Sequence, residues 1–166
     1  MANEAYIQVG TALSINGEAG ADYAWSVEGL ATASGRVSAQ IDLGAAPRPY
    51  LYHWTCEVIW QATPTQILLC ELLKAGAPDS DSTAIDGDVG ASDAAIPSVY
   101  CKVNMQYIGS VISELGSAGD VNRSSGYFVH YYRYLTLGII NNAGASINAT
   151  DSNFQFILTP VYYQGQ

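Results

Sequence analysis

A strict alternation of apolar and polar side chains between Tyr50 and Gln61 constrains the fold of this chain more than any other feature. One face of the segment is apolar and aromatic, with Tyr52, Trp54, Cys56, Val58 and Trp60. The other face carries His53, Thr55, Glu57 and Gln61. Because successive side chains of a β-strand point to opposite faces, this period of two predicts a central strand whose tryptophans enter the core.

Similar alternations recur along the chain. Residues 22–28 and 37–43 each predict a strand, and so does 100–113, where Cys101, Val103, Met105 and Tyr107 are expected to face inward. Residues 66–76 fit both a helix and a strand that is buried on two faces. We favour a strand there, because the neighbouring segments are strands and Thr63-Pro64-Thr65 has the composition of a turn.

The C-terminal quarter predicts a β-hairpin. Two runs rich in β-branched and aromatic residues, 127–140 and 153–161, flank Asn141, Asn142 and Gly144. These turn residues accept the left-handed backbone that a chain reversal needs. The segment 116–126 is expected to be a polar loop before the hairpin, and Pro160 to mark the end of the last strand.

These segments predict the fold class and its boundaries. Seven or eight strands without interleaved helices indicate an all-β protein, a single-domain antiparallel β-sandwich of jelly-roll type. A chain of 166 residues is long enough to bury such a core. We expect the sandwich to comprise residues 22–166, and residues 1–21, which are rich in alanine and broken by glycines, to form an extended N-terminal arm.

Charge and cysteine content exclude several classes of partner. The net charge is −9, and the six basic residues are scattered, so no basic footprint for nucleic acid is present. No apolar run approaches the length of a membrane span, and the N-terminus lacks the features of a signal peptide. Three cysteines, an odd number without metal-type spacing, suit free thiols in a reducing cytoplasm.

The residues that could perform catalysis do not form a recognisable set. There is no Gly-x-Ser-x-Gly elbow, and His53 and His130 are the only histidines. Glu57 and Glu71 could act as a glycosidase pair only if the fold brought them together. We therefore expect no enzymatic activity and no cofactor.

An acidic segment between residues 79 and 93 raises the question of calcium. It carries Asp79, Asp81, Asp86, Asp88 and Asp93. Several carboxylates on a flexible loop could bind a hard cation, but their spacing departs from the known calcium-loop pattern. We expect a solvated acidic loop and no metal site.

Tyrosine supplies the best candidate interface. Tyr131, Tyr132, Arg133 and Tyr134 are consecutive, and both residue types are enriched at protein interfaces. Since successive strand residues point to opposite faces, only part of this run can share one surface. The alternative is an aromatic platform on which sugar rings stack, as in a carbohydrate-binding module.

The segment 132–146, Tyr-Arg-Tyr-Leu-Thr-Leu-Gly-Ile-Ile-Asn-Asn-Ala-Gly-Ala-Ser, followed by Phe156-Ile-Leu-Thr-Pro-Val161, resembles small virion proteins of tailed bacteriophages. These are capsid decoration, or cement, proteins. The resemblance implies a structural β-sandwich subunit, a homo-oligomer with a trimer favoured, that binds the major capsid protein on the capsid surface and bridges capsomers. It also implies assembly in the host cytoplasm. The alternative is a carbohydrate-binding or receptor-binding module.

Overall fold

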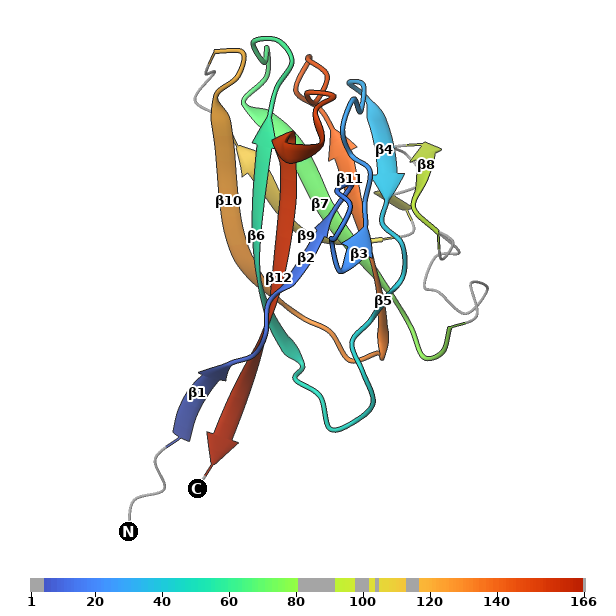
Figure 1. Cartoon of the computed structure of the whole chain (residues 1–166), viewed down its shortest axis with the longest axis vertical. Helices are drawn as coiled ribbons and strands as arrows, with labels where there is room; N and C mark the ends of the chain where they lie inside the picture. The colour runs from blue at the N-terminus through green and yellow to red at the C-terminus, as the bar shows by residue number, and fades with distance from the viewer. Residues whose placement is uncertain (1–4, 81–91, 98–101, 104, 113–116, 166) are drawn as a thin grey trace.

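The computed structural model describes residues 5–80, 92–97, 102–103, 105–112 and 117–165, and they form two packed β-sheets (Figure 1). Sheet A contains, in spatial order, β10 (Val121–Val129), β6 (Leu51–Ile59), β12 (Phe154–Gly165), β2 (Leu13–Asn16) and β3 (Tyr23–Ala24), with β1 (Ala5–Val9) also paired to β12. Sheet B contains β8 (Ala94–Pro97), β4 (Ser34–Val37), β11 (Tyr134–Asn141), β7 (Leu68–Ala77) and β9 (Gln106–Ile112), with β5 (Ile41–Asp42) paired to β11. The 3₁₀ turn η2 (Asp151–Asn153) precedes β12.

The path of the chain is that of a jelly roll. From β4 onward the larger strands alternate between the sheets, with β4 in B, β6 in A, β7 and β9 in B, β10 in A, β11 in B and β12 in A. Every pairing is antiparallel except that of β2 with β3. The prediction of an all-β antiparallel sandwich is confirmed, and residues 68–77 form a strand as favoured.

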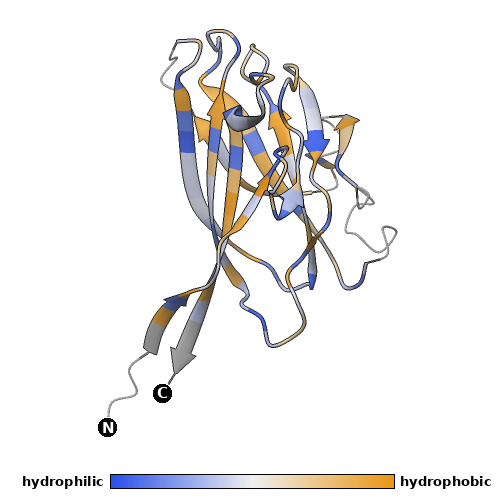
Figure 2. Ribbon diagram, viewed as in Figure 1, coloured by the Kyte–Doolittle hydropathy of each residue, from blue (hydrophilic) through white to orange (hydrophobic). Residues whose placement is uncertain are grey.

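The core is aromatic and centred on β6 and β12. The burial of β6 alternates as its sequence predicts, with Tyr52, Trp54, Cys56, Val58 and Trp60 buried. Trp25 packs edge-on against Phe154 and Phe156 from β12, with ring centroids 5.2 and 5.6 Å apart. Figure 2 shows the apolar residues alternating with polar ones along the central strands.

Trp54 has space only because two glycines face it. A Cβ atom added at Gly126 of β10 would lie 2.8 Å from the indole ring, and one at Gly109 of β9 would be closer still. The same ring stacks on Phe156, with centroids 6.0 Å apart. Trp54 therefore joins strands of both sheets through direct contact.

The predicted C-terminal hairpin is wrong. The run 127–140 is divided between β10 in sheet A and β11 in sheet B, and residues 153–161 belong to β12 in sheet A. β11 pairs with β7, β4 and β5, whereas β12 pairs with β6, β2 and β1. The segment between them crosses from one sheet to the other, because two apolar strands bury more surface face to face than edge to edge.

Two further expectations about residues 100–126 are corrected. Residues 121–126, expected to be loop, form the first part of β10, an edge strand in which Arg123 and Ser125 are exposed while Asn122 and Ser124 are half-buried. Val103 and Tyr107, expected to face inward, are 76% and 56% exposed, while Met105 is buried. β9 begins at Gln106, so Val103 precedes the strand. Within β9, irregular pairing with β7 shifts the register, so a simple alternation does not describe it. Cys101 lies outside the described residues.

The N-terminal residues are only partly an arm. Residues 13–16 form β2, and Ile15 is fully buried in the core, so the sandwich begins before residue 22. Residues 5–9 form β1, which pairs along the end of β12. β12 does not end at Pro160, whose carbonyl accepts a hydrogen bond from the Gly10 amide at 2.8 Å. The nitrogen of Pro160 faces the gap between the end of β1 and the start of β2. No strand there needs an N–H from this residue, so the proline is tolerated.

Gly126→Ala is expected to destabilise the protein by about 1–3 kcal/mol, because the added methyl group overpacks Trp54. Chemical unfolding followed by tryptophan fluorescence measures the difference. Ser125→Ala, at the neighbouring exposed position of β10, is the matched control and is expected to change stability by less than about 0.5 kcal/mol. Equal effects of the two substitutions would contradict the role assigned to Gly126.

Candidate functional site

An apolar surface lies at the end of the sandwich that carries both chain termini. There β1 and the end of β12 extend as a two-stranded ribbon beyond the body of the two sheets (Figure 1). We call this region the basal surface, and its residues are Ile7, Val9, Pro47, Arg48, Pro49, Tyr50, Leu51, Val129, Tyr131, Val161 and Tyr162. It combines exposed aliphatic and tyrosine side chains, as interfaces do.

A row of aliphatic residues crosses four strands at the base. Val9 pairs with Val161, Val161 with Leu51, and Leu51 with Val129. Directly paired residues of antiparallel strands share a face, so these side chains form one continuous row on the outer face of sheet A. Val9 and Val129 are exposed at its two ends, at 63% and 44%. Ile7, two residues before Val9, extends the apolar face along the ribbon.

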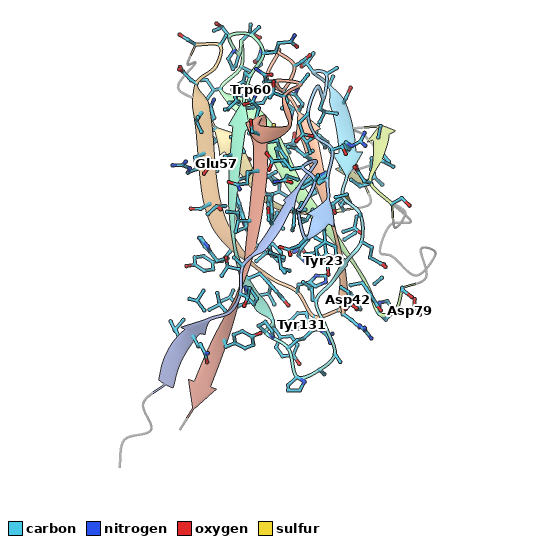
Figure 3. The ribbon with its side chains drawn as sticks, in the orientation of Figure 1. Tyr23, Asp42, Glu57, Trp60, Asp79 and Tyr131 are labelled. Carbon is cyan, nitrogen blue, oxygen red and sulfur yellow. The ribbon has the colours of Figure 1, made fainter. Side chains whose placement is uncertain are left out.

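A groove of about 650 Å³ lies beside this row. Its lining residues come from the connection before β6, the end of β10 and the ribbon: Pro47, Arg48, Pro49, Tyr50, Leu51, Val129, Tyr131, Val161 and Tyr162. The rings of Tyr50 and Tyr131 lie 5.4 Å apart, tilted by 46°, and both are largely exposed. Figure 3 shows Tyr131 at the basal end of the molecule, near the point where the ribbon leaves the body of the sandwich.

Arg48 holds the two connections of the groove together. Its Nη2 donates a hydrogen bond to the Tyr131 carbonyl at 2.6 Å, and its Nε donates one to the Tyr132 carbonyl at 3.1 Å. Its guanidinium group thereby fixes the crossover from β10 to β11 against the connection that precedes β6. Arg48 is also the sole charged residue of the basal surface.

The four predicted interface residues do not share one surface. They lie in or beside the crossover between β10 and β11, and Tyr131 alone of the four lines the groove. Arg133 donates two hydrogen bonds to Asp42, at 2.9 and 2.7 Å, and lowers the pKa of that carboxyl group. Tyr134 is partly buried beneath the Arg133 guanidinium, and Tyr132 packs edge-on against His130.

The two histidines occupy different environments. His53 lies on the outer face of sheet A and contacts the ring of Tyr127, with centroids 4.8 Å apart. His130 is buried, and its Nε2 donates a hydrogen bond to the Tyr134 carbonyl at 2.9 Å. Burial, together with the nearby positive charges of Lys74 and Arg48, lowers the pKa of His130 to about 4. His130 is therefore neutral at physiological pH.

The carboxylates considered for a glycosidase lie in different sheets. Glu57 of β6 pairs with Arg123 at 2.7 Å, and Glu71 of β7 pairs with Lys102 at 2.6 Å. Each is thus bound to a cation of its own sheet or of a neighbouring segment, and the fold does not bring the two together.

The described acidic, histidine and cysteine side chains do not form a metal site. Within the described part of the chain, no three His, Cys, Asp or Glu residues are close enough to hold a metal ion. Asp93 accepts hydrogen bonds from Arg36 at 2.7 Å and from the Ser26 amide at 2.9 Å, while residues 81–91 of the acidic loop lie outside the described residues. Cys56 and Cys70 are free and buried, and burial raises the pKa of both thiols.

Most of the basal surface was not identified from sequence. Tyr131 was predicted from its tyrosine-rich context, but Ile7 and Val9 were assigned to an arm, and Val161 to the end of a strand. The alternation Tyr6-Ile7-Gln8-Val9 and the run Val161-Tyr162-Tyr163 are the sequence signals that could have indicated an additional strand pair.

Comparisons with known proteins give limited information. No protein-family model matches the chain, and no curated protein matches its sequence. Among solved structures, murine APRIL is similar, with 9% identity, coverage of 74% of this chain and 71% of that one, and a TM-score of 0.39. The EclA C-terminal domain, a sugar-binding protein, has 11% identity, coverage of 99% and 79%, and a TM-score of 0.33.

A heated particle of Israeli acute paralysis virus is also similar, with 10% identity, coverage of 97% of this chain and 71% of that one, and a TM-score of 0.30. Likenesses this distant carry no argument about function. The fold class follows from the strand order of the chain itself. No helix among the described residues is long and apolar enough to span a membrane.

The stability of the protein is expected to fall as the pH decreases from 6.5 to about 4. In this window the unfolded chain binds a proton at His130 with its ordinary pKa of 6.5, while the folded chain does not. The stabilisation is complete above pH 6.5, and the loss is on the order of 3 kcal/mol by pH 4. Urea unfolding at a series of pH values, compared between the parent and His130→Gln, isolates this contribution from that of the carboxylates. Identical pH slopes in the two proteins would contradict it.

Proposed function

We propose that this chain is a structural protein of a tailed-phage virion that binds the outside of the capsid as an oligomer and bridges its subunits. The observation that carries this proposal is the basal surface, where aliphatic and tyrosine side chains are exposed together at one end of the fold. Contiguous exposed apolar surface of this kind marks an interaction site in soluble proteins. The resemblance of residues 132–146 and 156–161 to decoration proteins supplies the identity of the partner, the major capsid protein.

The mechanism of stabilisation would be linkage between binding and assembly. A protein that binds neighbouring shell subunits only when they are assembled stabilises the assembled state by its binding free energy. The rigid jelly-roll body suits this role, because the Trp54 contacts join strands of both sheets. No chemical step is required, and we propose that the protein is not an enzyme and acts in the virion.

Tyr50→Ser combined with Tyr131→Ser is expected to weaken binding to assembled capsids at least tenfold, because the two rings form the exposed aromatic pair of the groove. Co-sedimentation of the purified protein with capsids that lack it measures the affinity. Heat rupture of the same capsids, with and without the protein, measures the stabilisation.

Tyr107→Ser is the matched control, since Tyr107 is exposed to the same degree as Tyr50, at 56%, but lies on β9 of the other sheet. It is expected to bind capsids as the parent does. Failure of the parent protein to bind any capsid, or full binding by the double variant, would refute the proposal.

A carbohydrate-binding or receptor-binding module is the second candidate. The Tyr50 and Tyr131 rings, 5.4 Å apart beside a groove of about 650 Å³, could stack against sugar rings. This function predicts saturable binding to a glycan array that is lost in the same double variant. Glycan binding without capsid binding would favour it over the capsid role.

A further inference from the structure

We propose that the β1/β12 ribbon of one copy packs into the basal groove of a second copy, so that copies of this chain associate through ribbon-to-groove contacts. This inference depends on the proposed function only in placing the oligomer on a capsid. It concerns the way in which that oligomer is built, and it can be tested without capsids.

Among the described strands, β1 pairs only with β12. β6 begins at Leu51, opposite Val161, so β12 extends beyond the end of its neighbour. A two-stranded ribbon is marginally stable on its own in water. Ile7 and Val9 lie on one face of this ribbon and are 67% and 63% exposed. A second surface packed on that face would bury them and fix the ribbon.

The groove is mainly apolar, which suits the apolar face formed by Ile7 and Val9. Leu51, Val129 and Val161 form its aliphatic floor, and Tyr50 and Tyr131 stand exposed at its side. Its single charged residue, Arg48, already donates hydrogen bonds to two backbone carbonyls. Ile7 and Val9 of another copy could therefore enter the groove without leaving a charge unpaired.

The distribution of charge favours a second copy over another partner. The chain has a net charge of −9, yet the described residues of the ribbon and groove, 5–9, 47–51, 129–132 and 160–165, contain only Arg48 as a charged group. Like charges that face each other across an interface cost several kcal/mol. Two acidic copies meet little repulsion across these described residues, whereas a basic partner would find no acidic group among them to pair with.

The ribbon and groove adjoin each other on the subunit. β12 runs through both, and the ribbon points away from the body (Figure 3). A protrusion and a hollow on one subunit can join two copies by reciprocal exchange about a twofold axis, or join several copies head to tail. The ribbon-to-groove contact is the same in both arrangements, and the solution mass tells a dimer from a larger ring.

The first test is the solution mass of the full chain by light scattering, with 17.6 kDa for one copy. We expect an oligomer for the parent. Ile7→Asp, which places a charge on the ribbon, and Tyr50→Asp, which places one in the groove, are each expected to weaken assembly at least tenfold. Ile67→Asp is the matched control, because Ile67 is exposed to 63% but lies outside the ribbon and groove, and it should assemble as the parent does.

The second test distinguishes ribbon-to-groove from ribbon-to-ribbon contact. Copies carrying Ile7→Cys are mixed with copies carrying Tyr50→Cys, both in a Cys101→Ser background, and oxidised mildly. We expect the mixed disulfide to form in preference to either homodimer. Disulfides only between two Ile7→Cys copies, a monomeric parent, or undiminished assembly of both aspartate variants would each overturn the proposal.

The two proposals fail separately. An oligomer that forms as described but binds no capsid would refute the capsid function and leave the ribbon-to-groove contact intact. A monomer that binds capsids with full affinity would refute the ribbon-to-groove contact and the oligomeric form of the capsid proposal, but not capsid binding itself.

Discussion

The packing of Trp54 is the interaction on which the rest of the fold depends. Its indole ring stacks on Phe156 of the neighbouring strand and fills the space left by Gly126 and Gly109. These contacts involve strands of sheet A and, through Gly109 of β9, of sheet B. Since a core is packed almost as densely as an organic crystal, the ring fixes the distance between the sheets at this point. Tyr52 and Trp60 extend the same row along β6.

The arrangement of the sandwich also explains why the basal surface exists. β12 is longer than its partner β6, because the chain enters β6 at Leu51 after the proline-containing connection, while β12 continues to Gly165. The excess length pairs with β1 and leaves the body of the fold. The crossover from β10 to β11 passes the same end and places Tyr131 beside Tyr50. A jelly roll whose strands were equal in length would not expose this surface.

The predicted interface illustrates what sequence can and cannot show about a site. The 131–134 run, which was singled out for its tyrosines, lies beside the crossover between β10 and β11, and one member of it, Tyr131, lines the groove. Arg133 is occupied by Asp42, and Tyr134 lies partly buried below it. The sequence did not mark Leu51 and Val161 as surface residues. Aliphatic residues in a strand are usually assigned to the core, and only the extent of each sheet shows which of them lie at its end.

The sequence by itself determined several of the strands, β6 and β7 among them, and in β6 it determined which side chains face inward. That information is local, because the period of two is a property of the extended backbone, as in β6. The tertiary structure decided which sheet each strand joins. The runs around Tyr134 and Phe156 have the composition of hairpin partners, yet they lie in opposite sheets. Strand pairing is decided by contacts between residues distant in the chain and by the burial of both sheet faces, and neither is encoded in a short segment. The exposed ribbon and groove follow from that pairing.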